Sequence, residues 1–134
     1  MRKVQAEIEE TGTKSSLERP VESLLRAKRI ADYFADPCHL TIETSGYDDA
    51  FNRNQIQDRI VMVRTLFTAL TVSLNDISIR FPEKHTAKVL LTLRLNGHRG
   101  NESYADVQEV EATLSKTDGR WLLTSVHLVA VLER

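Results

Sequence analysis

The sequence has little cysteine, glycine and proline, and no long apolar run. Its 134 residues include one cysteine, five glycines and three prolines. A single cysteine, Cys38, excludes an internal disulfide and any metal site built from several cysteines. So few glycines provide no glycine-rich loop that could cradle phosphates. No apolar run approaches the roughly 18 residues of a membrane-spanning helix, so we expect no membrane span in this chain.

An excess of charge of either sign is also lacking. Eighteen basic side chains face 19 acidic ones, which gives a formal net charge of −1 and a pI of about 6.4. A nucleic-acid-binding domain usually carries a basic stripe, so we expect no nucleic-acid partner. The 41% hydrophobic and 28% charged residues are typical of a soluble globular domain, and the length suits one domain with its own core.

The sequence carries no targeting signal that would fix the cellular compartment. The first ten residues are polar and contain no apolar segment of a secretory signal. Read as it stands, the sequence is that of a cytoplasmic protein. A chain trimmed of a signal or anchor would look the same, and it would then be extracytoplasmic, so the localisation stays open.

Several catalytic classes are disfavoured by the spacing of the polar residues. The four histidines form no His-x-His or His-x₃-His pair, so we expect neither a metal nor another cofactor. No Gly-x-Ser-x-Gly nucleophile elbow is present, and Cys38 has no neighbours in the sequence that would activate its thiol.

Helical patterns occupy the first half of the chain. We expect residues 1–18 to form a flexible arm or a short leading helix, and residues 19–134 to form a single domain. Proline near the start and Pro37 at the end delimit a helix over 19–36. A short strand over 38–44 and a loop over 45–49 follow. Asn52 and Gln55 then predict a capped second helix, with one buried apolar stripe: Ile56, Ile60, Val63, Phe67 and Leu70.

From Leu70 onward the apolar period changes to two, which predicts four long antiparallel strands joined by short turns. The phase switches near Asn75 and Asp76, which predicts a β-bulge there. We therefore expect an α+β fold in which a curved antiparallel sheet wraps around two or three amino-terminal helices. Such a sheet encloses a cone that can hold a ligand pocket.

The later strands are expected over 86–96, 103–116 and 120–132, with turns at 82–85, 97–101 and 117–119.

Over residues 19–132 the chain resembles the nuclear transport factor 2-like family, also called SnoaL-like, whose fold is a cystatin-like α+β roll. The clearest sign is the segment Lys116-Thr117-Asp118-Gly119-Arg120-Trp121, which is similar to the family's closing Lys-x-Asp-Gly-x-Trp hairpin. The other matching segments are Ala31-Asp32-Tyr33-Phe34, Asn52-Arg53-Asn54-Gln55-Ile56, Leu70-Thr71-Val72-Ser73 and Ala87-Lys88-Val89.

This resemblance implies a cone-shaped α+β roll but says little about activity. The family includes isomerases, dehydratases, epoxide hydrolases, polyketide cyclases, transport adaptors and binding domains. No motif of this chain aligns with the Asp-plus-Tyr site of the ketosteroid isomerases or with the Asp-Arg-Asp site of the epoxide hydrolases. An enzyme assignment by resemblance therefore fails.

Candidate catalytic residues lie on the last two strands. Tyr104, Asp106 and Gln108 share the phase of the apolar residues that follow them, so we expect them on the concave face near its open end. A phenol and a carboxylate in an apolar cone could do acid–base work; alternatively, this end of the strand runs past the helices into water. His127 is expected to act as a general base oriented by Asp106, or else to be an ordinary satisfied or interfacial histidine.

Other residues complete the expected site and assembly. Lys28 falls in the apolar arc of the first helix, where it either faces a pocket or extends to water along its own methylenes. The expected ligand pocket comprises Lys28, Phe34, His39, Gln108 and Trp121. By alternation, the convex face would expose an apolar patch that predicts a homodimer: Leu90, Val107, Val126, Leu128, Ala130 and Leu132.

Three functions are compatible with these patterns. The first is a non-catalytic nuclear transport factor 2-like domain that binds a small apolar ligand or a protein partner in or around its cone. The alternative is a small-molecule isomerase, dehydratase or cyclase that uses Asp106, His127 and Tyr104. The third is an extracytoplasmic interaction domain.

Overall fold

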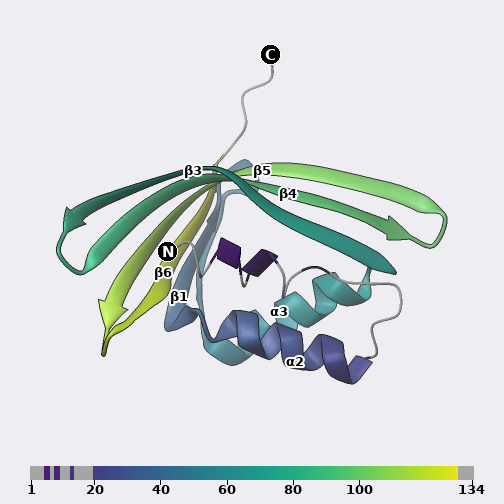
Figure 1. The fold of residues 1–134 in the computed structure, drawn as a ribbon, viewed down its shortest axis with the longest axis horizontal. Coiled ribbons are helices and arrows are strands. Elements are labelled where there is room, and N and C mark those ends of the chain that lie inside the picture. The colour runs from purple at the N-terminus through teal and green to yellow at the C-terminus, as the bar shows by residue number, and fades with distance from the viewer. Residues whose placement is uncertain (1–4, 7, 10–12, 14–19, 130–134) are drawn as a thin grey trace, which may run out of the picture.

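A single curved sheet arches over two helices in the computed structural model, which describes residues 5, 6, 8, 9, 13 and 20–129 (Figure 1). The helices α2 and α3 pack against each other beneath one half of the sheet. The elements are α2 (Pro20–Ala31), β1 (Phe34–Ile42), the 3₁₀ turn η1 (Glu43–Ser45), β2 (Tyr47–Phe51), α3 (Arg53–Thr65), β3 (Ala69–Glu83), β4 (Thr86–Arg99), β5 (Glu102–Thr117) and β6 (Arg120–Val129).

The six strands form one sheet in the order β2-β1-β6-β5-β4-β3. Every neighbouring pair is antiparallel except β1 and β6, which run parallel and join the amino-terminal part of the fold to its last strand. The predicted α+β class, a curved sheet wrapped around helices, is confirmed. Of the arm or leading helix expected over 1–18, only residues 5, 6, 8, 9 and 13 are described, and the first four of them are helical.

The first helix ends earlier than predicted. α2 stops at Ala31, and Phe34 already belongs to β1, in which Pro37 is an interior residue. Two constraints favour this outcome: the residue before a proline is disfavoured in helical conformation, and the Tyr33 carbonyl accepts a 2.8 Å hydrogen bond from the Leu123 N–H of β6. The chain is therefore already committed to the sheet where the apolar spacing still suggested a helix.

The loop predicted over 45–49 is also wrong. Residues Tyr47–Phe51 form β2, an edge strand paired antiparallel with β1. Its middle positions, Asp48 and Asp49, are exposed, whereas Phe51 is buried. Polar residues are common on edge strands because they discourage pairing with other chains, so this strand looks like a loop in the sequence.

The capped second helix is confirmed, whereas its predicted buried stripe is buried only at Phe67 and Leu70, which lie beyond the helix. The Asn52 side chain accepts a 2.8 Å hydrogen bond from the Gln55 N–H, and the Gln55 side chain accepts one of 2.9 Å from the Asn52 N–H. α3 ends at Thr65, so the predicted stripe runs on past the helix into a connection and β3. Val63 is exposed, and the buried residue of the helix is Arg64, which is only 2% exposed.

Bulges set the register of the long strands. The pairing of β3 with β4 shifts between Asn75 and Ser78, and Asp76 has a φ of 52°, which confirms the predicted bulge. Two other shifts are unpredicted: β3 shifts again against β4 between Arg80 and Glu83, and β6 shifts against β5 at Thr124. The Asp-Gly turn after β5 is confirmed, with φ values of 51° and 77° at Asp118 and Gly119. β4 continues to Arg99, beyond the predicted end at 96.

The core lies on the concave side of β4, β5 and β6. Its cluster of buried residues is Ala87, Val89, Ala112, Leu114 and Leu123. Phe34 and Trp121, both expected to line the ligand pocket, pack against this cluster.

We predict that Asn52→Ala lowers the free energy of unfolding by about 1 kcal/mol, because it removes one half of the capping box at the start of α3. Urea denaturation monitored by circular dichroism measures this loss. Asn54→Ala, which changes an exposed asparagine inside the same first turn, is the matched control. Equal stabilities of the two variants would contradict a role for the cap.

Candidate ligand-binding site

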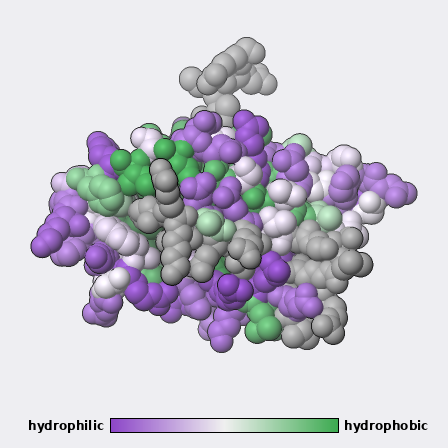
Figure 2. Space-filling view, in the orientation of Figure 1, coloured by the Kyte–Doolittle hydropathy of each residue, from purple (hydrophilic) through white to green (hydrophobic). Residues whose placement is uncertain are grey.

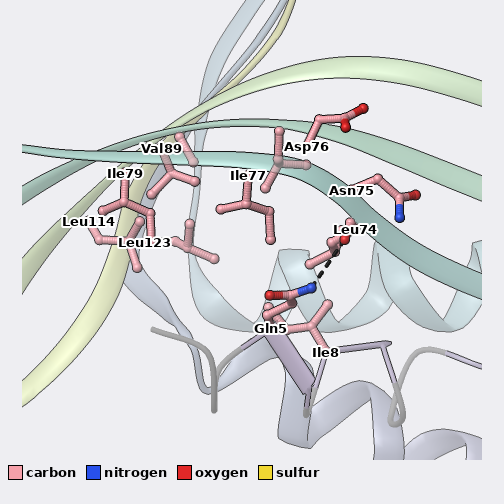
Figure 3. A pocket seen from close by; sticks show the side chains of 12 residues that line it. Gln5, Ile8, Leu74, Asn75, Asp76, Ile77, Ile79, Val89, Leu114 and Leu123 are labelled. Atoms are coloured by element: carbon pink, nitrogen blue, oxygen red, sulfur yellow. Dashed lines mark hydrogen bonds between the residues drawn. The ribbon is translucent and has the colours of Figure 1, made fainter.

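A pocket of about 560 Å³ lies on the concave side of the sheet, between β3–β6 and the amino-terminal helical residues (Figure 3). In the space-filling view, a patch of apolar side chains lies at the upper left of the molecule, and most of the visible face around it is hydrophilic (Figure 2). The pocket is lined by Gln5, Ile8, Leu74, Asn75, Asp76, Ile77, Ile79, Val89, Leu91, Ala112, Leu114 and Leu123.

The lining is almost entirely aliphatic. Nine of these twelve residues are Leu, Ile, Val or Ala, and the polar ones are Gln5, Asn75 and Asp76. The Asp76 carboxylate points away from the pocket, whereas Ile77 points into it (Figure 3). The bulge in β3 produces this arrangement, because one extra residue returns the apolar side chains after it to the concave face.

The amino-terminal residues that close the pocket also protect the edge of the sheet. β3 is an edge strand, whose backbone groups would otherwise lack a neighbour on one side. The Leu74 N–H donates a 2.9 Å hydrogen bond to the Glu9 carboxylate, and the Leu74 carbonyl accepts one of 3.1 Å from the Gln5 amide. The Val72 N–H donates to the Thr13 hydroxyl at 3.2 Å. These side chains replace a missing strand and hold Gln5 and Ile8 over the pocket.

Three of the predicted site residues do come together, but not in this pocket. Tyr104, Asp106 and Gln108 share one face of β5, and the Gln108 amide donates hydrogen bonds of 3.3 and 3.2 Å to the two Asp106 oxygens. Partial burial and, after it, the neighbouring Asp106 carboxylate raise the pKa of Tyr104. None of the three is among the residues that line the pocket.

Tyr104 has a packing role that the sequence did not suggest. Tyr104 pairs with Gly97 of the neighbouring strand β4, and this glycine has no side chain. Its ring packs against Phe67 with the two centroids 5.1 Å apart. A methyl group added at Gly97 would lie 2.6 Å from the Ala69 carbonyl oxygen and 3.0 Å from the Phe67 ring, so only glycine fits this position without a shift of the backbone.

His127 lies on the opposite face of the sheet from Asp106. It pairs with Glu111, whose neighbours Val110 and Ala112 are buried on the concave side, so His127 and Glu111 both face outward. The bulge at Thr124 is the cause, since it moves all later residues of β6 by one position. The expected Asp106–His127 pair is therefore not brought together. The prediction assumed regular alternation of side chains along the last strand, and the bulge breaks that alternation.

The remaining predicted residues are also dispersed. Lys28 is exposed on α2, and His39 is exposed on β1, where its ring contacts the Asp48 carboxylate. Trp121 stacks obliquely on Phe81, with ring centroids 5.9 Å apart. Of the expected pocket residues, namely Lys28, Phe34, His39, Gln108 and Trp121, none lines the described pocket.

The predicted outer apolar patch is smaller than expected. The bulge at Thr124 turns Val126 and Leu128 to the concave side, where they pair with Ala112 and Val110. Leu90 and Val107 face outward and are 52% and 43% exposed. The other two predicted members, at positions 130 and 132, lie outside the described residues.

Nucleophile and metal chemistry find little support in the described part of the chain. Burial raises the pKa of the Cys38 thiol to about 11, so the thiol stays protonated near neutral pH. No group of three or more His, Cys, Asp or Glu side chains among the described residues could hold a metal ion. None of the described helices has the length and apolar character needed to cross a membrane.

Comparisons with known proteins show similarity of structure but not of sequence. No protein-family model matches the sequence, and no curated protein is significantly similar to it. A scytalone dehydratase-like protein from Novosphingobium aromaticivorans superposes with a TM-score of 0.70 at 14% identity, over 98% of this chain and 79% of that one. LinA gives 0.73 at 14% identity, over 98% and 83% of the two chains. A protein of unknown function with a cystatin-like fold from Nostoc punctiforme gives 0.67 at 12%, over 95% and 85%.

We predict that Glu9→Ala speeds hydrogen exchange of the Leu74 amide, because the variant leaves the edge of β3 without the carboxylate that accepts its hydrogen bond. Exchange measured by nuclear magnetic resonance reports this amide separately from others. Glu102→Ala, at an exposed position at the start of β5, is the control and should leave Leu74 unchanged. Unaltered exchange in Glu9→Ala would show that Glu9 does not hold this edge.

Proposed function

Since the chain has the nuclear transport factor 2-like, or cystatin-like, α+β roll, we propose that it is a non-catalytic domain that binds a small apolar molecule. The binding site is the pocket between the amino-terminal helical residues and β3–β6. The observation that carries this proposal is the lining, in which nine of twelve residues are aliphatic.

The size and chemistry of the pocket fit such a ligand. Small-molecule pockets typically enclose about 300–1,000 Å³ and are mainly apolar with a few polar groups. The pocket of about 560 Å³ falls in this range, and its polar groups are those of Gln5, Asn75 and Asp76. Transfer of apolar surface from water into this lining supplies the binding free energy, at roughly 25 cal/mol per Å² buried.

A second candidate is acid–base catalysis by an isomerase, dehydratase or cyclase. One observation favours it: the Tyr104 phenol lies beside the Asp106 carboxylate, and partial burial followed by this carboxylate raises the pKa of Tyr104. The structural neighbour described as scytalone dehydratase-like is consistent with such chemistry, but at 14% identity it supports the fold alone. We rank this candidate second because the pair lies outside the apolar pocket and His127 is on the other face of the sheet.

We predict that Nile red, a neutral apolar dye, binds the protein and that Ile77→Trp weakens this binding at least about tenfold, because the indole fills the pocket. Titration followed by dye fluorescence measures the affinity. Thr71→Trp places the same side chain at an exposed position of the same strand and should bind the dye like the unchanged protein.

Thermal unfolding of both variants separates loss of the pocket from loss of the fold. If Ile77→Trp unfolds near the temperature of the unchanged protein and still binds the dye equally well, the proposed site is wrong. Equal weakening by Thr71→Trp would place the dye elsewhere on the surface.

We also propose a homodimer that pairs the outer sheet faces around Val107, whose exposed side chain would be covered by the second copy. Light scattering should give twice the 15.2 kDa chain mass at micromolar concentration. Val107→Asp should shift this mass to that of one chain, and Leu66→Asp, at an exposed position after α3, should not. A single-chain mass for the unchanged protein would contradict the dimer.

A further inference from the structure

A second hollow, of about 720 Å³, lies on the outer face of the sheet, opposite the apolar pocket. The pairing of the strands places the outward-facing side chains of this hollow in two adjacent rows that cross five strands. The first row, from β1 to β3, is His39, Ser125, Thr113, Lys88 and Arg80; the second is Thr41, His127, Glu111, Leu90 and Ser78.

Cationic and hydroxyl donors in this hollow have no partner within the described part of the chain. The Arg80 guanidinium and the Lys88 ammonium form no ion pair there, and both side chains are exposed. The hydroxyls of Ser78, Thr113 and Ser125 form no hydrogen bond with any described residue. Five side chains that can donate hydrogen bonds therefore border one hollow, and no described residue occupies them.

The two cations lie directly opposite each other. Arg80 of β3 pairs with Lys88 of β4, and both point outward because their neighbours Ile79 and Val89 line the inner pocket. Like charges at directly opposed positions of a sheet destabilise it. A bound anion would remove this repulsion and form charge-assisted hydrogen bonds with both side chains.

Acidic groups on the same face lie around the two histidines, and Glu83 lies further along β3 from Arg80, where it pairs with Thr86. His127 is held between two carboxylates, with its Nε2 atom 3.2 Å from Glu43 and its Nδ1 atom 3.7 Å from Glu111. His39 likewise contacts Asp48. The carboxylates of Glu43 and Asp48 disfavour an anion beside the two histidines, which leaves the Arg80–Lys88 pair as the cationic part of this hollow.

We propose that this outer hollow binds an oxyanion of the phosphate class between Arg80 and Lys88, with the Thr113 and Ser78 hydroxyls as further donors. The planar guanidinium suits two oxygens of such a group, and the ammonium supplies a compact charge beside it. This site uses side chains on the face opposite the apolar pocket, so it stands apart from the ligand site proposed above.

Inorganic phosphate is the probe for this site. The unchanged protein, Lys88→Gln, Arg80→Gln and the control Lys84→Gln, an exposed lysine in the β3–β4 turn, are titrated at low salt and monitored by thermal unfolding. We expect phosphate to raise the unfolding temperature of the unchanged protein and of Lys84→Gln in a saturable manner, whereas chloride at equal ionic strength does not. Affinity should fall at least about tenfold in Lys88→Gln and in Arg80→Gln.

The unfolding temperatures of the same four proteins without phosphate provide an independent test. At low salt, Lys88→Gln should unfold about 1–4 °C above the unchanged protein, because it removes the repulsion from Arg80. Lys84→Gln should not. Equal phosphate responses in all four proteins, or a lower unfolding temperature of Lys88→Gln without phosphate, would overturn the proposal.

Two further measurements distinguish the source of the anion and the competing occupant. Tighter binding of glycerol phosphate than of phosphate would identify a phosphorylated small molecule as the ligand, and equal binding would identify phosphate itself. Amide shifts of Thr113 and Ser78 on titration locate the anion even if Arg80→Gln fails to fold. A phosphate effect that appears only as a change in mass by light scattering would assign this hollow to a second copy of the chain and overturn the anion site.

Discussion

The pairing of long antiparallel strands, interrupted by one extra residue at three points, is the constraint on which the rest of this molecule depends. A strand presents successive side chains to opposite faces, so each bulge exchanges the faces for every residue after it. The bulge near Asp76 keeps Leu74 and Ile77 on the concave side. The bulge at Thr124 does the same for Leu123 and Val126.

The bulges near Asp76 and at Thr124 give the sheet two chemically different faces. The concave face is aliphatic and closes an apolar pocket with the help of the amino-terminal residues, whose side chains bond to the edge of β3. The outer face collects hydroxyls, histidines paired with carboxylates, and two cations that form no ion pair with any described residue. One strand such as β4 therefore serves both faces, with Val89 lining the pocket and Lys88 bordering the polar hollow.

The same geometry explains why acid–base groups that the sequence contains do not form one catalytic site in the described structure. Tyr104 and Asp106 adjoin each other, but Tyr104 fills the space left by Gly97 and packs on Phe67. His127 has carboxylate neighbours on the outer face instead. An acid–base site needs its groups within hydrogen-bond reach of one substrate, and the sheet itself separates these.

The sequence by itself determined the α+β class, the capped helix at Asn52, the bulge near Asp76 and the Asp-Gly turn, because each is encoded by local spacing or by a residue with a special backbone preference. It could not determine where the first helix ends or that β2 is a strand, since hydrogen bonds to distant segments decide both. Nor could it place His127, because the bulge at Thr124 leaves no signal in a strand that is apolar in both phases. Which residues share a site was decided only by the tertiary structure, since a single inserted residue reverses the face of all that follow it.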